Sequence, residues 1–427
     1  MAERERETPA GFTEKAFVVV VLLLSTSAFL NLGGQDSGKP DEGSMGMQVL
    51  WLCIYLFTII LLWRRPFGLL AKIRKEIWLI LLVGYTLCST FWSCDPRLTV
   101  RRGIALICTT LFALYFAGRY PLKQQLRLLA AAFGIAAVFS FIFQLLGIGS
   151  AVDVGVPGWI GVYVQKNVLG ANMALGTAVM LIVRLYDIEY RNLATLGATL
   201  ALALLILSRS MTSVLMLLAV LSVFPLSRWV RRGYRTVVMG ALIVIPLSLY
   251  GLIWVLHNLP TITSVLGRDP TLTGRVPLWI LSAILASRRP WLGYGYNAFW
   301  RGLEGPSAPI WRLLSWKPPN SHNGFLEVWL GLGLLGLGLL LVSLIVYTVR
   351  AVRYLRAIQT ADRFWPLMFL ALTVVSNLTG ANILSRNTLS WILYVAVGSV
   401  TATLPSDVHE DDHASADIVG QLKRSPE

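Results

Sequence analysis

The chain has 427 residues, of which 56% are hydrophobic and only 14% are charged, and its formal net charge is +15. Soluble domains contain roughly 45–50% apolar residues, so this composition excludes an ordinary soluble protein and predicts an integral membrane protein. The basic residues are divided among short segments rather than gathered on one face, which argues against a nucleic-acid-binding protein.

Twelve apolar runs approach the ~20 residues that an α-helix needs to cross a ~30 Å hydrocarbon core. They lie at 16–33, 47–63, 77–92, 103–118, 128–148, 168–183, 193–208, 211–227, 236–256, 323–349, 364–380 and 388–404, and the third, sixth and eighth are short. The first run is followed by no small-residue cleavage pattern, so we expect a retained helix rather than a signal peptide. The sequence predicts an all-α polytopic membrane protein with about 12 transmembrane helices.

The basic residues predict the topology, because short loops rich in Lys and Arg stay on the cytoplasmic side. With both termini inside, 23 of the 37 basic residues are cytoplasmic, although Arg97, Arg101 and Arg102 go against the rule. We therefore expect residues 1–256 to hold helices 1–9, residues 257–322 to form a large external, periplasmic loop with short amphipathic helices, residues 323–404 to hold helices 10–12, and residues 405–427 to form a cytoplasmic polar tail.

Two patterns that resemble metal or disulfide sites lack the necessary context. The four cysteines, Cys53, Cys88, Cys94 and Cys108, show no CxxC spacing, and three lie inside predicted spans. Residues 409–413 read H-E-D-D-H and satisfy the H-E-x-x-H zinc pattern, but they lie in the polar tail without an apolar face to dock. We interpret them as a solvated acidic tail, and we expect no metal and no cofactor.

Two short polar segments mark span ends on the expected outer side. Gln165-Lys166-Asn167 opens the sixth span, where polar donors would add to the positive end of the helix dipole and favour an anion. Alternatively, Lys166 extends to the lipid headgroups. Arg209 lies in a very short turn between the seventh and eighth spans and would point into an outward cavity, or it marks the membrane boundary.

Two more candidate segments lie in the external loop. Arg275 precedes a short amphipathic helix expected at 278–286, and an arginine fork suits a diphosphate because it bonds two phosphate oxygens at once. Tyr294 and Tyr296 follow, with ring faces that suit a sugar or the membrane interface equally well. His322, at the head of the tenth span, titrates near working pH and is either a general base or a structural histidine. We expect the adjacent Asn323 to orient His322 and to contact the substrate.

Three motifs resemble the O-antigen ligase and polymerase superfamily. They read Thr273-Gly274-Arg275-x-x-x-Trp279, then RPWLGYGYNAFW at 289–300, then HNGFL at 322–326. Within that superfamily the chain looks most like the succinoglycan-type exopolysaccharide polymerases. Weaker resemblances at 92–96 and 165–170 extend the likeness over nearly the whole chain outside its tails.

The resemblance implies a twelve-helix fold and a metal-independent glycosyl transfer on the outer face of the bacterial inner membrane. The donor would be a polyprenyl-diphosphate-linked oligosaccharide, and a flippase and a chain-length regulator of the same pathway would be partners. Arg275 would stabilise the leaving diphosphate, and His322 would serve the acceptor hydroxyl. Arg209 fits less well, because it precedes Ser210-Met211-Thr212 instead of lying between the Ser and the Thr. Gly331 departs from the Glu of many members, and Glu327 is the only acid nearby.

Two other activities remain open at this point. An O-antigen ligase would use the same donor but a lipid-A-core acceptor, and sequence motifs separate ligases from polymerases poorly. A polysaccharide or solute transporter would be expected to show paired interrupted helices in two related halves, and the chain has no internal repeat.

Overall fold

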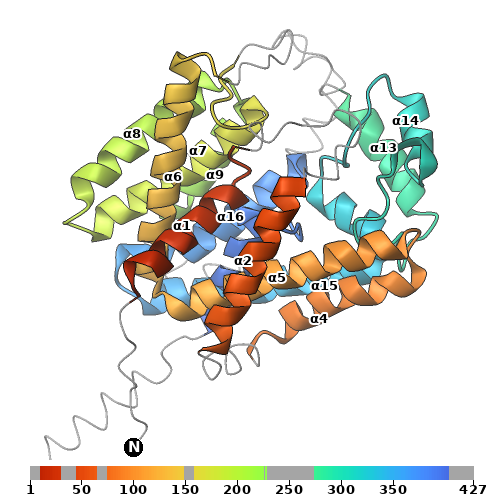
Figure 1. Ribbon diagram of the computed structural model, residues 1–427, viewed down its shortest axis with the longest axis horizontal. Helices are drawn as coiled ribbons and strands as arrows, with labels where there is room; N and C mark the ends of the chain where they lie inside the picture. Colours follow the sequence, from red (N-terminus) through yellow and green to blue (C-terminus); the bar gives the residue numbers. More distant parts are fainter. Residues whose placement is uncertain are drawn as a thin grey trace, which may run out of the picture.

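The computed structural model describes residues 10–29, 45–64, 75–148, 158–225, 227 and 274–402, and every regular element within them is helical (Figure 1). The longer helices are α1 (Phe12–Ser25), α2 (Met45–Trp63), α4 (Ile77–Cys88), α5 (Pro96–Arg119), α6 (Leu122–Leu145), α7 (Lys166–Tyr186), α8 (Arg191–Leu207), α9 (Met211–Leu221), α13 (Arg275–Ala286), α15 (Gly324–Ala357), α16 (Trp365–Thr379) and α17 (Leu389–Ala402). The shorter ones are η2 (Ser89–Trp92), η3 (Gly302–Glu304), α14 (Ala308–Leu313) and η4 (Ala361–Phe364).

Some predicted features lie outside the described residues: the ninth span at 236–256, the external loop at 257–273 and the polar tail at 405–427 with its H-E-x-x-H pattern. Each of the other eleven predicted runs overlaps a helix. Five described helices, α2, α5, α6, α7 and α15, are long and apolar enough to cross a membrane. Others are shorter than predicted, so the predicted count of 12 spans stays a prediction; α1, for example, covers Phe12–Ser25 rather than 16–33.

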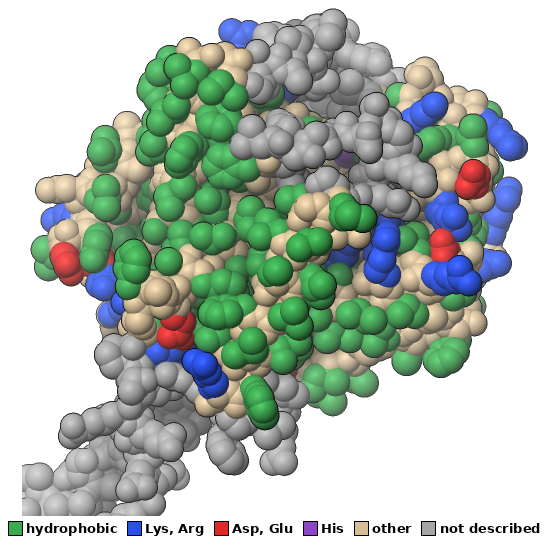
Figure 2. All heavy atoms as spheres, in the orientation of Figure 1, with side chains coloured by type: hydrophobic (Ala, Val, Ile, Leu, Met, Phe, Trp, Pro, Cys, Tyr) green, Lys and Arg blue, Asp and Glu red, His purple; other side chains and the backbone are tan. Residues whose placement is uncertain are grey.

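The outward-facing surface of the helices is apolar, as a lipid environment requires. Figure 2 shows hydrophobic side chains over the face formed by α1, α2, α6 and α8, while Lys and Arg gather on the side that carries α13 and α14. On α2, Leu52 and Trp63 are exposed. A soluble protein rarely exposes so large an apolar area, so the chain is a multi-pass membrane protein.

The helices form two neighbouring groups. Helix α7 packs against α6, α8 and α9, and Figure 1 shows this group on one side of the molecule. Helix α15 packs against α4, α13, α16 and α17, and α17 also packs on α5. The contact of α9 with α16 joins the two groups. Large aromatic side chains such as Phe133, Trp365 and Trp391 are fully buried in the core between them.

Paired charges gather at one end of the bundle. Arg119 at the end of α5 bonds to Glu14 at the start of α1 (2.7 Å), and Arg127 near the start of α6 pairs with Asp187, which follows α7. Arg350 on α15 pairs with Glu76 (2.9 Å), which precedes α4. The helix ends that these ion pairs join border segments that the sequence assigns to the cytoplasm, and these ends lie at one end of the molecule. Which side of the membrane that end faces stays a prediction.

At the opposite end, α15 is interrupted and a loop fills the interruption. Gly333 has φ +69°, and a Cβ there would lie 2.1 Å from the Trp291 carbonyl oxygen, so only glycine fits. The break frees two carbonyls and two N–H groups that would bond to one another in a continuous helix. The loop at 290–295 satisfies all four: Tyr294 N–H donates to Leu330 O (2.9 Å), Gly295 N–H to Gly331 O (2.9 Å), Leu334 N–H to Pro290 O (2.7 Å) and Leu335 N–H to Trp291 O (3.3 Å).

The same loop is also fixed to the start of α5. Cys94 N–H donates to the Tyr294 carbonyl (3.0 Å), and the buried Arg102 donates to the Asn297 carbonyl. Arg301 forms an ion pair with Asp95 (2.8 Å), the residue that caps α5. Two of these groups are basic and lie on the expected outer side. The bond to Asn297 gives Arg102 a structural role that the charge rule does not take into account.

Candidate functional site

Arg275 and His322 lie side by side at the end of the molecule where α15 begins. Arg275 is the first residue of α13, and its Nη1 donates to the carbonyl of Thr379 (3.1 Å). Thr379 ends α16, so Arg275 binds a carbonyl that the helix itself leaves unsatisfied. An arginine has five N–H donors, and among the described residues this is the only hydrogen bond that Arg275 makes. Its remaining donors have no partner among the described residues, so they could bind an anion.

His322 has a backbone conformation that directs it away from the helix it precedes. Its φ is +50°, and its own N–H is held by the side chain of Asn320 (2.9 Å). The imidazole packs against Trp316, with ring centroids 5.7 Å apart. None of the described residues forms a hydrogen bond with the imidazole nitrogens. They are therefore available to a substrate group.

The charge state of His322 is set by burial and by Arg275. Half-burial of the ring and the positive charge of Arg275 lower the pKa of His322 from 6.5 to about 4. Burial also lowers the pKa of Arg275, but a guanidinium stays charged at neutral pH. At neutral pH the site thus combines a fixed cation with an uncharged imidazole, which can accept a proton.

Trp316 contributes a further donor that the sequence did not indicate. Its indole N–H is buried and has no acceptor among the described residues. A Cβ added at Gly274, the residue before Arg275, would lie 2.9 Å from this nitrogen. The unsatisfied N–H therefore lies near the start of α13, on a ring that also contacts His322, and an oxygen-rich ligand that reached it would satisfy it.

The segment that carries His322 is fixed on both sides. Asn323 caps α15, and its Oδ1 accepts from Phe325 N–H (3.1 Å) and Leu326 N–H (3.0 Å). The carboxylate of Glu327 accepts from Ser321 N–H (2.9 Å) and from the indole of Trp300 (3.0 Å). Asn323 was expected to contact substrate, whereas here its amide oxygen is used by the cap. Glu327, noted in the sequence only as the acid near Gly331, positions the residues before His322.

A second polar cluster brings together the other two predicted segments. Asn167, in the first turn of α7, accepts from the hydroxyl of Ser210 (2.9 Å), in the turn after α8. Lys166, the first residue of α7, also lies near the turn after α8. A Cβ at Gly158 would meet both the Lys166 Cδ (2.9 Å) and the Ser208 carbonyl oxygen (2.5 Å). The exposed Arg209 has φ +52°. Lys166 and Asn167 therefore lie beside the short turn that carries Arg209, and these three residues make up the second cluster.

The two clusters lie at the same end of the bundle. Helices α9 and α16 pack together, and Phe224 after α9 touches Phe364 before α16, with ring centroids 4.9 Å apart. The end of α9 therefore meets the start of α16, and the two helices are antiparallel. The start of α9, which follows Arg209 and Ser210, accordingly lies at the end of α16 where Thr379 accepts from Arg275.

Tyr294 and Tyr296 do not present their rings as the sequence analysis expected. Both are buried, and their hydroxyls donate to the carbonyls of Leu285 and Leu384 (2.8 Å each). The reason is the docking of their loop on α15, which turns the side chains into the core. In this structure they hold the loop in place and do not line the cluster around Arg275.

Two comparisons with known proteins each find a similarity. Residues 196–341 match the protein-family model described as O-antigen ligase, a stretch that includes Arg209, Arg275 and His322. Over 313 residues the chain is 26% identical to the exopolysaccharide production protein ExoQ of Rhizobium meliloti (strain 1021), which covers 69% of this chain and 68% of the relative. The chain therefore carries an O-antigen ligase family domain and is a membrane homologue of an exopolysaccharide production protein.

Proposed function

We propose that this protein is a glycan polymerase of the bacterial inner membrane, with its active site facing the periplasm. It transfers a polyprenyl-diphosphate-linked sugar chain onto a sugar hydroxyl of another lipid-linked repeat unit during exopolysaccharide synthesis. The observation that carries the proposal is the adjacency of Arg275 and an uncharged His322 at one end of the helix bundle. The family domain and the similarity to ExoQ support the same class of reaction.

The chemistry divides between the two side chains. The acceptor hydroxyl attacks the anomeric carbon and gives its proton to the imidazole of His322. The bond between that carbon and the diphosphate oxygen breaks, and the diphosphate leaves with the electron pair. Arg275 and the Trp316 N–H stabilise the charge that develops on it, and a fixed donor of this kind typically contributes ~2.7–4 kcal/mol. The imidazolium then returns its proton to water.

The charge of Arg275 makes proton transfer to His322 depend on whether the lipid-diphosphate glycan donor is bound. In the free protein, Arg275 helps to hold the pKa of His322 near 4, which makes it a weak base. A bound diphosphate offsets the charge of Arg275, so the pKa of His322 rises toward its ordinary value. A base is most effective when its pKa lies near the working pH. Binding of the donor therefore activates the base.

The second cluster has a place in the same reaction. Lys166, Asn167 and Arg209 lie at the same end of the bundle as Arg275 and offer positive charge at the N-terminus of α7. We propose that they hold the second lipid-linked unit, whose sugar hydroxyl is the acceptor, by its diphosphate or its glycan.

An assay with purified protein tests the function. Lipid-linked repeat units supplied without an energy source should be joined into longer glycans, with one polyprenyl diphosphate released for each new bond. The matched family description favours a second candidate, an O-antigen ligase. A ligase would transfer the glycan only when a lipid-A-core acceptor is added. Movement of the lipid-linked units across vesicles without elongation would show a transporter and contradict the proposal.

Arg275 should not be replaceable by lysine. Arg275→Lys should lose roughly 10²–10³-fold in turnover, nearly as much as Arg275→Ala, because an ammonium cannot reproduce the two parallel bonds to a diphosphate. The rate of glycan elongation at matched protein levels measures this. Arg288→Lys is the control, since Arg288 is exposed near the end of α13 and away from the cluster. Normal elongation by Arg275→Lys would contradict the role.

His322 should act on the acceptor and not on donor binding. His322→Ala should reduce turnover by roughly 10²–10⁴-fold, the usual contribution of a positioned base, and leave the dissociation constant of the lipid-diphosphate donor nearly unchanged. Gln should partly restore turnover if hydrogen bonding to the hydroxyl is part of the role. His257→Ala serves as a control for loss of an external histidine. Loss of donor binding in step with turnover would make His322 a diphosphate ligand instead.

A further inference from the structure

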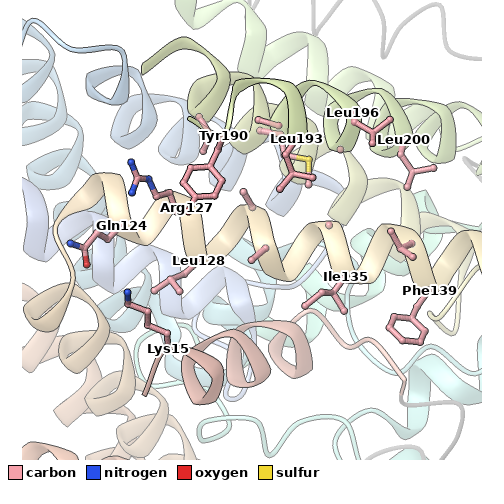
Figure 3. Close-up of a pocket in the computed structure, with 18 of the residues that line it drawn as sticks. Lys15, Gln124, Arg127, Leu128, Ile135, Phe139, Tyr190, Leu193, Leu196 and Leu200 are labelled. Carbon is pink, nitrogen blue, oxygen red and sulfur yellow. The ribbon is translucent and has the colours of Figure 1, made fainter. Parts of the chain in front are cut away.

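A large apolar groove lies on the opposite half of the molecule, away from Arg275. It has a volume of about 690 Å³, within the range of about 300–1,000 Å³ usual for small-molecule sites. Helices α6 and α7 form its floor, and α1 and α8 form its walls (Figure 3). Exposed side chains of α8 such as Leu193 and Leu196 border it. The groove therefore opens on the lipid-facing surface.

The two ends of the groove differ in chemistry. Figure 3 shows Lys15, Gln124 and Arg127 at one end, whereas Phe139 and Leu200 lie at the other. Leucine, isoleucine, valine and alanine side chains line most of the stretch between them. This division into a polar end and a long apolar part matches the shape of a membrane lipid.

The polar end carries unbalanced positive charge. Glu14 is paired with Arg119, and Asp187 is paired with Arg127, whose guanidinium also lies over the Tyr190 ring at 5.1 Å. Lys15 is exposed and has no charged partner among the described residues. The Lys15 ammonium, the Arg127 guanidinium and the Gln124 amide are all donors, so this end suits a phosphate.

The length of the apolar part matches one leaflet of a bilayer. On the floor of the groove it runs along α6 from Leu128 to Phe139. At 1.5 Å per residue, these 11 steps give about 17 Å, close to half of a ~30 Å hydrocarbon core. An acyl chain whose phosphate lies at Lys15 would reach about to the middle of the membrane.

We propose that this groove binds an anionic phospholipid of the cytoplasmic leaflet, with its phosphate at Lys15 and Arg127 and an acyl chain along α6. It is not the donor site, because its polar end lies beside Asp187, after the end of α7, whereas Lys166 and Asn167 lie at the start of that helix. The 21 residues of α7 separate the two ends by about 30 Å. The proposal is independent of the glycosyl transfer.

Two substitutions address the two halves of the groove. Lys15→Glu removes the free cation. Gly134→Leu fills the floor, and the backbone tolerates it because a Cβ at Gly134 would meet only the Cε of Met180, at 3.8 Å. The matched controls are Lys123→Glu, which changes a cation at the same end but outside the groove, and Gly338→Leu, on α15, where a Cβ has open space.

The full-length protein is reconstituted in phosphatidylcholine vesicles with and without phosphatidylglycerol, extracted, and analysed by native mass spectrometry for retained lipid. We expect the unaltered protein and both controls to retain phosphatidylglycerol in preference to phosphatidylcholine. Lys15→Glu should reduce phosphatidylglycerol retention about fivefold or more, and Gly134→Leu should abolish retention of either lipid.

Three outcomes would overturn the proposal. Equal retention of the two lipids by the unaltered protein would show that the groove does not select an anionic headgroup. Normal phosphatidylglycerol retention by Gly134→Leu would place the lipid elsewhere. Displacement of phosphatidylglycerol by a polyprenyl phosphate added in equal amount would identify the occupant as the carrier lipid.

Discussion

The interruption of α15 is the feature on which the outer end of this protein depends. Within a membrane, backbone groups must be satisfied by the protein itself, and Gly333 releases two carbonyls and two N–H groups at once. The loop at 290–295 binds all four and is fixed in turn to the start of α5. Because this loop follows directly after α13, its docking places Arg275 against the end of α16 and next to His322. Backbone hydrogen bonds of this loop thus help to position the pair to which we assign the reaction.

The charged residues of the chain have different tasks at the two ends of the bundle. At the end that we assign to the cytoplasm, buried or half-buried carboxylates neutralise arginines, as with Glu76 and Arg350, and these pairs join helix ends. At the other end, Arg301 is paired with Asp95, whereas Arg275 faces a carbonyl and an imidazole and has no carboxylate beside it among the described residues. In the proposed reaction, an anionic diphosphate would balance the charge of Arg275 at the outer end. At the inner end, Lys15 beside the groove has no charged partner among the described residues, and the proposed phospholipid would balance its charge.

Much of the helical architecture was predictable from the sequence because apolar runs report directly on helices, whereas the sidedness that the basic loops indicate stays a prediction. The segments that carry Arg275, His322, Lys166 and Arg209 could be found as polar groups at span ends. Their grouping into two clusters was not predictable, since it depends on the antiparallel contact of α9 with α16. The hydrogen bond from Arg275 to the Thr379 carbonyl was also not predictable, because it depends on how distant helices pack. Tyr294 and Tyr296 were misplaced because a Pro- and Gly-rich segment reads as an exposed loop, whereas its backbone is used to repair α15.

The central claim is that Arg275 and His322 act as a coupled pair whose charges respond to the donor. Titration of the His322 imidazole by NMR, in protein with isotope-labelled histidine, tests this most directly. In the free protein the pKa should lie near 4 because of burial and Arg275, and it should rise toward 6.5 when polyprenyl diphosphate is added. A pKa near 6.5 in the free protein that does not change on addition of the diphosphate would contradict the account.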